Sequence, residues 1–238
     1  MPLPPRPGQG AGMADLEIRD ARGRELVAGC ALLATELGFA PRDALPPWLV
    51  QTAAASDGIA LGAFRNGSLI GFSAAIPAEP GALFSCGLAV ESQFRGQGIG
   101  RQLKLAQRER ALASGRTVIR WTAEPLSASA LGLYLSGLGA RLVDYGVGLY
   151  ADVRPAAVPP DDVTIEWTLE DRPGDGPPAT SVEVPFDYRR LGQERFHEWR
   201  LRVRRAMASA IDAGAVGTGV ATDRGSERAW VLFSAPGP

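Results

Sequence analysis

The order of apolar and polar residues along the chain predicts alternating strands and helices. Residues 24–37 repeat apolar side chains close to the helical period, and Gly38 follows as an end signal. Two apolar runs, 59–64 and 69–76, flank Asn66-Gly67, a pair typical of tight hairpin turns. The sequence therefore predicts a helix followed by an antiparallel hairpin.

The same patterns predict the other elements of the chain. They indicate strands at 16–19, 83–90, 117–122, 143–153 and 164–169, and helices at 46–56, 101–113 and 127–138. In residues 143–153 the odd positions are apolar, which is typical of a half-exposed antiparallel strand. Beyond residue 180 we expect a strand at 181–185, a helix at about 191–213, and a hairpin of 215–222 with 229–233.

A glycine-rich segment, Arg95-Gly96-Gln97-Gly98-Ile99-Gly100, joins the predicted strand 83–90 to the helix 101–113. Glycines let the backbone approach a ligand closely, and free N–H groups at the positive end of a helix favour an anion. The segment therefore predicts a site for a phosphorylated cofactor. A glycine turn that only starts the helix is the plainer alternative.

Two nucleotide-binding motifs fit this segment less well. A Walker loop needs Lys and then Ser or Thr after its last glycine, but Arg101 and Gln102 follow here. A dinucleotide fingerprint needs a different glycine spacing and a later carboxylate, and residues 116–123 contain none. Nucleotide binding through the same loop stays a weaker alternative.

The segment Arg-x-x-Gly-x-Gly resembles the motif with which the GNAT superfamily of acyl-CoA-dependent N-acyltransferases grips the CoA pyrophosphate. The resemblance covers residues 14–170. It implies an α/β GNAT fold with a mixed central sheet flanked by helices, in which the parallel strands 83–90 and 117–122 splay apart around acyl-CoA. A looser resemblance to a bacterial subfamily of predicted GNAT acetyltransferases rests on Trp121-Thr122-x-Glu124-Pro125-Leu126 and includes the tail.

The resemblance also implies roles for individual residues. Glu124 is the first candidate for the base and Glu91 the second, while Tyr134, within Leu-Tyr-x-x-x-Leu-Gly, would protonate the leaving thiolate. Backbone groups at a bulge near Gly87 would hold the thioester carbonyl. The residues expected to bind the cofactor are Leu88, Ala89, Val90, Arg95, Gly96, Gln97, Gly98, Ile99, Gly100 and Arg101.

Each candidate side chain also fits a purely structural role. The tyrosine ring could simply pack, and the two glutamates could be exposed loop acids. A glycine in mid-strand, such as Gly87, could merely thin a packed face. These alternatives stay open on the sequence alone.

Composition narrows the classes of partner. The chain has 238 residues, a formal net charge of -1, and hydrophobic and charged fractions of 45% and 21%. With this balance we expect neither nucleic acid nor a membrane as a partner, and we expect a cytoplasmic location. Cys30, Cys86 and the single histidine, His197, lack the spacing of metal ligands, so we expect no metal and no disulfide.

Composition also predicts the domain organisation. We expect a disordered leader at 1–13, the acyltransferase domain at 14–170, a Pro- and Gly-rich linker at 171–180, and a small α/β extension at 181–238. The helix at 191–213 is rich in arginine, which is typical of a solvated face and could also grip an acidic partner or a CoA phosphate. That helix and strand 143–153 could each meet a partner, which leaves a homodimer open.

The sequence thus predicts an enzyme that transfers an acetyl group from acetyl-CoA to a primary amine by direct attack. The alternative is a CoA-binding regulatory or scaffold module without turnover. In the family the acceptor pocket is built from segments that correspond to 40–48 and 153–163, which carry few charges here. This favours a weakly charged or apolar amine.

Overall fold

The computed structural model describes residues 16–40, 43–152, 160–170 and 174–236. The chain forms two compact units: Met1–Ala75 with Gly87–Gln107, and Ile76–Cys86 with Arg108–Pro238. The predicted leader at 1–13 lies outside the described residues.

The first unit contains the predicted hairpin. Its strands are β1 (Leu16–Asp20), β2 (Ile59–Arg65), β3 (Ser68–Pro77) and the second half of β4 (Ala82–Val90). β1 pairs with β2, and β2 with β3, in antiparallel register. The turn falls at Asn66 and Gly67, with φ of 50° and 76°, which confirms the expected position.

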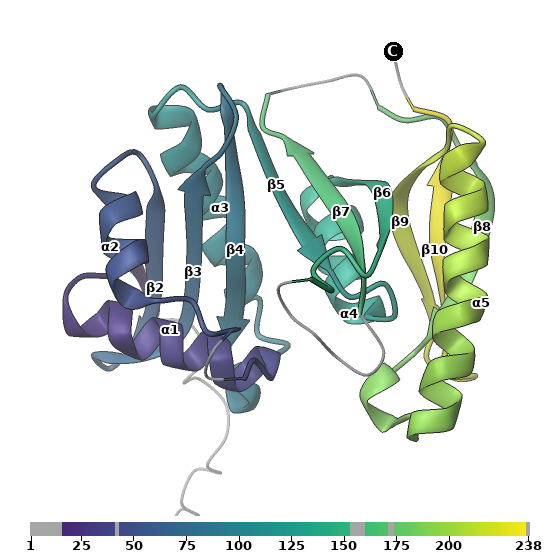
Figure 1. Ribbon diagram of the computed structural model, residues 1–238, viewed down its shortest axis with the longest axis horizontal. Coiled ribbons are helices and arrows are strands. Elements are labelled where there is room, and N and C mark those ends of the chain that lie inside the picture. The colour runs from purple at the N-terminus through teal and green to yellow at the C-terminus, as the bar shows by residue number, and fades with distance from the viewer. Residues whose placement is uncertain (1–15, 41–42, 153–159, 171–173, 237–238) are drawn as a thin grey trace, which may run out of the picture. The chain divides into compact units, whose positions relative to one another are not determined.

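Helices cover both faces of these strands. They are α1 (Arg24–Leu37), α2 (Pro47–Ala54) and α3 (Ile99–Ala113). A Cβ on Gly29 of α1 would lie 2.3 Å from Phe72 of β3, whereas a Cβ on the neighbouring Gly71 would meet Leu103 of α3 at 3.1 Å. Because successive residues of a strand point to opposite faces, α1 and α3 pack on opposite sides, as Figure 1 shows.

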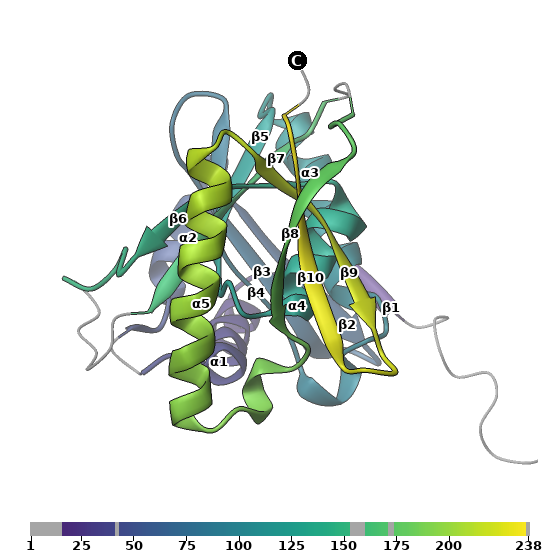
Figure 2. The same cartoon turned by 90° about the vertical axis from the view of Figure 1, so that its right-hand side faces the viewer.

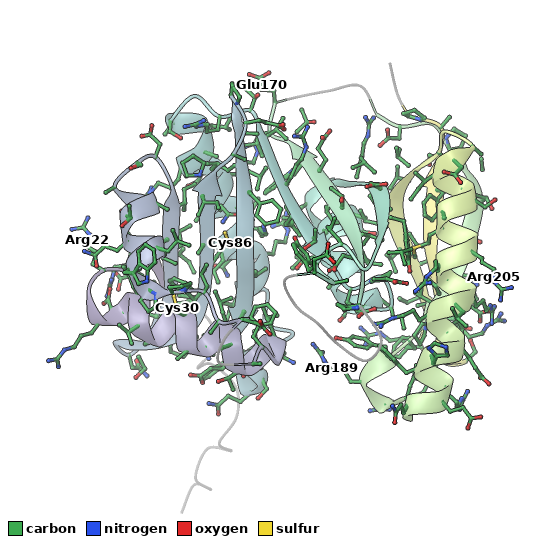
Figure 3. All side chains as sticks on the ribbon, in the orientation of Figure 1. Arg22, Cys30, Cys86, Glu170, Arg189 and Arg205 are labelled. Atoms are coloured by element: carbon green, nitrogen blue, oxygen red, sulfur yellow. The ribbon has the colours of Figure 1, made fainter. Side chains whose placement is uncertain are left out.

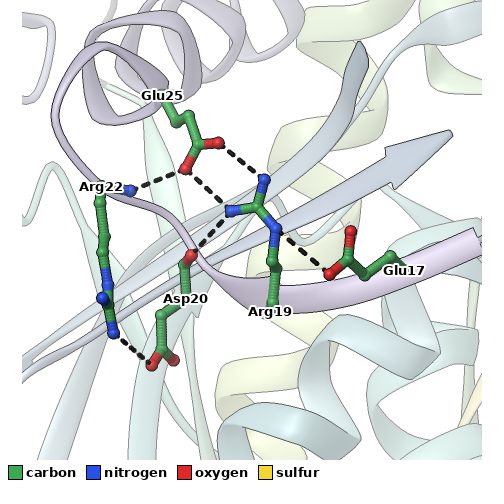
Figure 4. Close-up of polar contacts among 5 residues, drawn as sticks. All are labelled: Glu17, Arg19, Asp20, Arg22 and Glu25. Carbon is green, nitrogen blue, oxygen red and sulfur yellow. Dashed lines mark hydrogen bonds and ion pairs between the residues drawn. The ribbon is translucent and has the colours of Figure 1, made fainter. Parts of the chain in front are cut away.

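A polar cluster holds the start of α1 (Figure 4). Arg19 of β1 donates to both carboxylate oxygens of Glu25, at 2.9 and 2.7 Å, and the backbone N–H of Arg22 donates to the same carboxylate at 2.9 Å. The capping residue Gly23 makes no side-chain hydrogen bond, and Glu25 in the first turn instead ties α1 to Arg19 of β1 and to the residue before the cap. The helix ends at Gly38 in the left-handed region, as predicted.

The second unit is a longer mixed sheet. Its strand order is β4, β5 (Val118–Ala123), β7 (Asp161–Thr168), β6 (Arg141–Val147), β9 (Val216–Asp223), β10 (Arg228–Ser234) and β8 (Pro178–Pro185). β4 and β5 pair in parallel from Ala82↔Val118 to Phe84↔Arg120. The other described pairs of this unit are antiparallel.

The predicted extension continues this sheet. The helix α5 (Gln193–Asp212) packs against β6 and β8, and Figure 2 shows it running alongside β8 and β10. Val203 and Met207 of α5 are fully buried, so its apolar face lies against the sheet as expected. Together with the helices of the first unit, this confirms the predicted mixed α/β class.

Four elements differ from the prediction, and one of them is β7, which begins at Asp161 rather than at 164. Strand β6 ends at Val147 rather than 153, and Val147 is 57% exposed. The helix expected at 127–138 is α4 (Ala128–Leu131) followed by a π-helical segment, Gly132–Gly137. β8 begins at Pro178, three residues before the strand expected from 181. The end of the predicted strand, Val153, and residues 171–173 lie outside the described residues.

Among the described residues, no helix is long and apolar enough to cross a membrane.

The cluster at the start of α1 predicts a pH-dependent contribution to stability. Hydrogen bonds from Arg19 and Arg22 lower the pKa of Glu25 to about 2 from the usual 4.5. A depressed carboxyl pKa stabilises the fold above pH 4.5, and this contribution is lost as pH falls toward 2. We therefore expect Glu25→Gln to lower the urea midpoint at pH 7 and to lower it less at pH 3. Glu17→Gln, at an exposed partner of the same arginine, is the control. An equal difference at both pH values would contradict the role of Glu25.

Candidate functional site

The glycine loop of the first unit offers a set of backbone donors. Gly96 and Gly98 have φ of 76° and 79°, a region that disfavours side chains, and a Cβ on either would meet no atom within 4 Å. The first bond of α3 runs from the N–H of Gln102 to Gly98 O at 3.1 Å. The N–H groups of Ile99 and Gly100 therefore have no acceptor within the helix, and they lie at its positive end. The loop has the open backbone that an anion site requires.

Side chains hold this loop in place. Arg95 forms an ion pair with Glu36 of α1 and donates from Nε to Val90 O at 3.2 Å. The other oxygen of Glu36 accepts from the backbone N–H of Ser92 at 3.1 Å. Gln97 accepts from Arg65 at 3.2 Å. Arg95, expected to bind the cofactor, thus already serves to tie the loop to α1.

Close packing against α1 explains the glycine at position 87, near the end of β4. A Cβ on Gly87 would lie 2.8 Å from Leu33 of α1, so a glycine lets that helix come close. Of the next three residues, Ala89 is buried, whereas Leu88 and Val90 are half-buried. The backbone of Glu91 continues the contact with β3 through its N–H, which donates to Ile70 O at 2.9 Å.

In the second unit, Glu124 follows β5 and meets an arginine from the C-terminal extension. Glu124 Oε2 accepts from Arg200 Nη2 at 3.2 Å, and its Oε1 accepts from the N–H of Leu126 at 3.2 Å. Desolvation raises the pKa of Glu124, Arg200 opposes this shift, and the negative charges of Asp162 and Asp161 add to it. A carboxylate with a raised pKa is a better proton acceptor than an exposed one.

Arg200 itself corrects one expectation. The interpretation of the arginines as a solvated face is wrong for this residue, which is 6% exposed. Its guanidinium also lies over the ring of Phe196, with its carbon 4.5 Å from the ring centroid. The signal was present in the sequence, because Arg200 stands at helical spacing between Phe196 and Met207 of the apolar face.

One turn further along α5, a second arginine is paired in the same way. Arg204 donates to both oxygens of Asp161, at 2.9 and 2.8 Å, and Tyr145 Oη donates to Asp161 Oδ2 at 2.7 Å. Asp161 is 1% exposed. Sequence reasoning missed this carboxylate, although the alternation of Val163, Ile165 and Trp167 in β7 extends back to it.

Tyr134 lies in the π-helical segment of the second unit. Its ring meets the ring of Trp121 edge-on, with centroids 5.1 Å apart. Burial raises the pKa of Tyr134 to about 12, so the phenol keeps its proton throughout the physiological range. π-helical turns are rare and frequently occur at functional sites. Two residues on, Ser136 Oγ accepts from the N–H of Val220 in β9 at 2.9 Å, which ties this segment to the extension.

The remaining candidates are Glu91, the two cysteines and any group of metal ligands. Glu91, in the first unit, precedes a single 3₁₀ turn, Ser92–Phe94, and accepts from the side chain of Gln93 at 2.9 Å. Cys30 and Cys86 are not joined in a disulfide, and the Cys86 thiol donates to Phe84 O at 3.7 Å. Within the described ranges, no group of three His, Cys, Asp or Glu side chains is arranged to hold a metal ion.

Comparison with known families agrees with this architecture. Residues 27–140 match the sequence model of the acetyltransferase (GNAT) family. That range runs from α1 through the glycine loop, Glu124 and Tyr134. Among curated proteins, none matches the chain in sequence.

Solved structures resemble the chain in fold. The ribosomal-protein-S18-alanine N-acetyltransferase of Escherichia coli is 15% identical with a TM-score of 0.54, covering 66% of this chain and 96% of its own. A GNAT family acetyltransferase from Elizabethkingia anophelis with acetyl-CoA bound is 19% identical with a TM-score of 0.51, covering 65% and 99%. YncA from Salmonella typhimurium with its cofactor acetyl-CoA is 15% identical with a TM-score of 0.56, covering 67% and 97%. About a third of this chain therefore has no counterpart in these structures.

Proposed function

We propose that the protein transfers an acetyl group from acetyl-CoA to a primary amine by direct attack, and the match of residues 27–140 to the acetyltransferase (GNAT) family supports this proposal. The single observation that carries the proposal is the glycine loop, because its backbone donors at the start of α3 suit a pyrophosphate. The family match includes this loop.

Direct attack requires two proton transfers. The amine nitrogen forms a bond with the thioester carbon, and the bond from that carbon to sulfur breaks. Glu124 is our candidate to accept the amine proton, since desolvation makes its carboxylate more basic. Tyr134 is our candidate to protonate the departing thiolate, since its phenol is protonated at working pH. Glu91 is the second candidate for the base.

The cofactor would be bound mainly by backbone groups. We assign the pyrophosphate to the N–H groups of residues 96–100, and the acyl-bearing arm to the backbone of Leu88, Ala89 and Val90. Arg95 would act by holding the loop in place through its ion pair with Glu36, and Arg101 borders the loop and would add positive charge. The fold family implies no metal. A weakly charged acceptor amine, a homodimer and a cytoplasmic location stay predictions from the sequence.

The direct test is release of CoA thiol from acetyl-CoA in the presence of a panel of amines. We expect release that depends on one class of amine. Tight CoA binding without release for any amine would favour a regulatory or scaffold module instead. Protection against thermal unfolding by ATP or NAD, but not by CoA, would favour a nucleotide-binding protein.

The glycine loop predicts a loss of affinity when its backbone is blocked. Gly98→Val places a branched side chain on the open side of the loop and strains a residue with φ of 79°. We expect the affinity for acetyl-CoA, measured by calorimetry, to fall by about tenfold or more. Gly115→Val is the matched control, since Gly115 has φ of 72° and equally open surroundings at the end of α3. If the Gly98→Val protein folds and binds acetyl-CoA with normal affinity, the glycine loop is not part of the acetyl-CoA site.

Tyr134→Phe tests the proton donor. The variant keeps the ring beside Trp121 and removes only the hydroxyl. We expect kcat to fall by about 10²–10⁴-fold with acetyl-CoA affinity nearly unchanged. Tyr188→Phe, where the ring lies 6.2 Å from Phe196 in the extension, is the control for loss of a tyrosine hydroxyl. Full kcat in Tyr134→Phe on the best amine would show that the residue only packs.

Glu124→Gln tests the base through the pH dependence of the rate. A base must be ionised, so activity should fall as pH drops through the pKa of Glu124, which burial has raised. We expect Glu124→Gln to lower kcat/KM and to remove this acidic limb from the pH–rate profile. Glu91→Gln is the matched comparison. If the limb persists in Glu124→Gln and disappears in Glu91→Gln, the assignment of the base is reversed.

A further inference from the structure

Helix α5 belongs to the C-terminal extension, yet it reaches the loop after β5. Its residues Arg200 and Arg204 stand one turn apart and pair with Glu124 and Asp161, respectively. The Arg200 side chain is buried, with 7% of its surface exposed, the Arg204 side chain is half-buried, with 29% exposed, and the Asp161 side chain is fully buried. A buried charge needs a partner, so these two pairs fix the helix against the ends of β5 and β7.

The charges around Glu124 come from several elements. Arg200 of α5 is the cation that bonds it, and Asp161 and Asp162 of β7 act on it as like charges. The Tyr145 hydroxyl of β6 donates to Asp161, and the charge of Glu124 also acts on Tyr145. Arg204 is committed to Asp161 through both of its bonds. Arg200 is therefore the positive group placed to hold the Glu124 carboxylate in its ionised form.

We propose that Arg200 is a positioning residue for acyl transfer, through which the C-terminal extension orients Glu124 and keeps it ionised. This inference rests on the proposed function, because it takes Glu124 as the base. Two of the Glu124 contacts define its orientation: the bond from Arg200 on Oε2 and the bond from the Leu126 N–H on Oε1. Desolvation alone would favour the neutral acid, and a neutral acid cannot accept a proton from the amine.

The extension also supports the other candidate of this unit. The hydrogen bond from the Val220 N–H to Ser136 joins β9 to the π-helical segment that carries Tyr134. A Cβ on Gly219 of β9 would lie 3.5 Å from Ser136 Oγ, so the strand passes close to that segment. The extension therefore contacts the segments of both proton-transfer candidates.

The test compares arginine variants of the same helix in the full chain. Arg200→Met keeps much of the length and removes the charge, and Arg200→Lys keeps the charge and loses the planar fork. Arg205→Met is the matched control, because Arg205 is exposed, donates to Leu201 O on its own helix at 3.3 Å and points away from the ribbon in Figure 3. Each variant is first checked for folding by circular dichroism and for acetyl-CoA affinity by calorimetry.

We expect Arg200→Met to bind acetyl-CoA like the wild type and to move the acidic limb of the pH–rate profile to higher pH. On the acidic side, kcat/KM should fall by about tenfold, since loss of an adjacent opposite charge favours the neutral carboxyl. Arg200→Lys should restore part of the loss, and Arg205→Met should change nothing. In a Glu124→Gln background, Arg200→Met should add little, because the group that it acts through is gone.

A second measurement separates this inference from the proposed function. Carbon-13 NMR of labelled glutamate carboxyls, with the Glu124 signal assigned through Glu124→Gln, follows the titration of Glu124 without any acceptor. We expect this titration to move to higher pH in Arg200→Met. An unchanged titration overturns the role of Arg200, whether or not transfer occurs. A wild type that releases no thiol with any amine of the panel overturns the proposed function, while the titration of Glu124 still decides the role of Arg200.

Discussion

The second unit depends on the rule that a buried charge must be paired. Arg200 and Asp161 are both almost completely buried, and each faces an opposite charge from another element. Removing one partner of a buried pair typically costs about 3–5 kcal/mol, because the other charge is left without solvent or counterion. Moving helix α5 away from the sheet would therefore separate Arg200 from Glu124 and Arg204 from Asp161. This makes the extension an integral part of the unit, joined to the sheet through β9 and β6 as well as through these pairs.

Sequence patterns predicted those parts of the fold that depend on interactions between residues close together in the chain. The bounds of α1 and its end at Gly38 match the prediction, because a left-handed glycine cap acts within a few residues. The hairpin at Asn66-Gly67 follows from the φ angles that these two residues tolerate. The position of the glycine loop could also be predicted, because Gly96 and Gly98 are its residues with positive φ. The helix after it, α3, begins at Ile99, two residues before the predicted start.

Tertiary contacts decided the parts that the sequence could not predict. Apolar alternation extends beyond Val147, but β6 ends there, and Val147 and Leu149 are exposed. The π-helical turn at Gly132–Gly137 has no residue signature and lies against β9. The helical spacing of Arg200 from Phe196 and Met207 could place it on the buried face, but nothing in the sequence indicates that Arg200 meets Glu124 or that Arg204 meets Asp161. The pairing partner of a buried charge is a property of the fold.

The central claim is that the glycine loop holds acetyl-CoA through its backbone. Its most direct test is a crystal structure of the protein with acetyl-CoA bound. We expect pyrophosphate oxygens within hydrogen-bond distance of the N–H groups of residues 96–100, with the ion pair between Arg95 and Glu36 still formed. A cofactor whose pyrophosphate lies elsewhere, with those N–H groups facing only solvent, would contradict it.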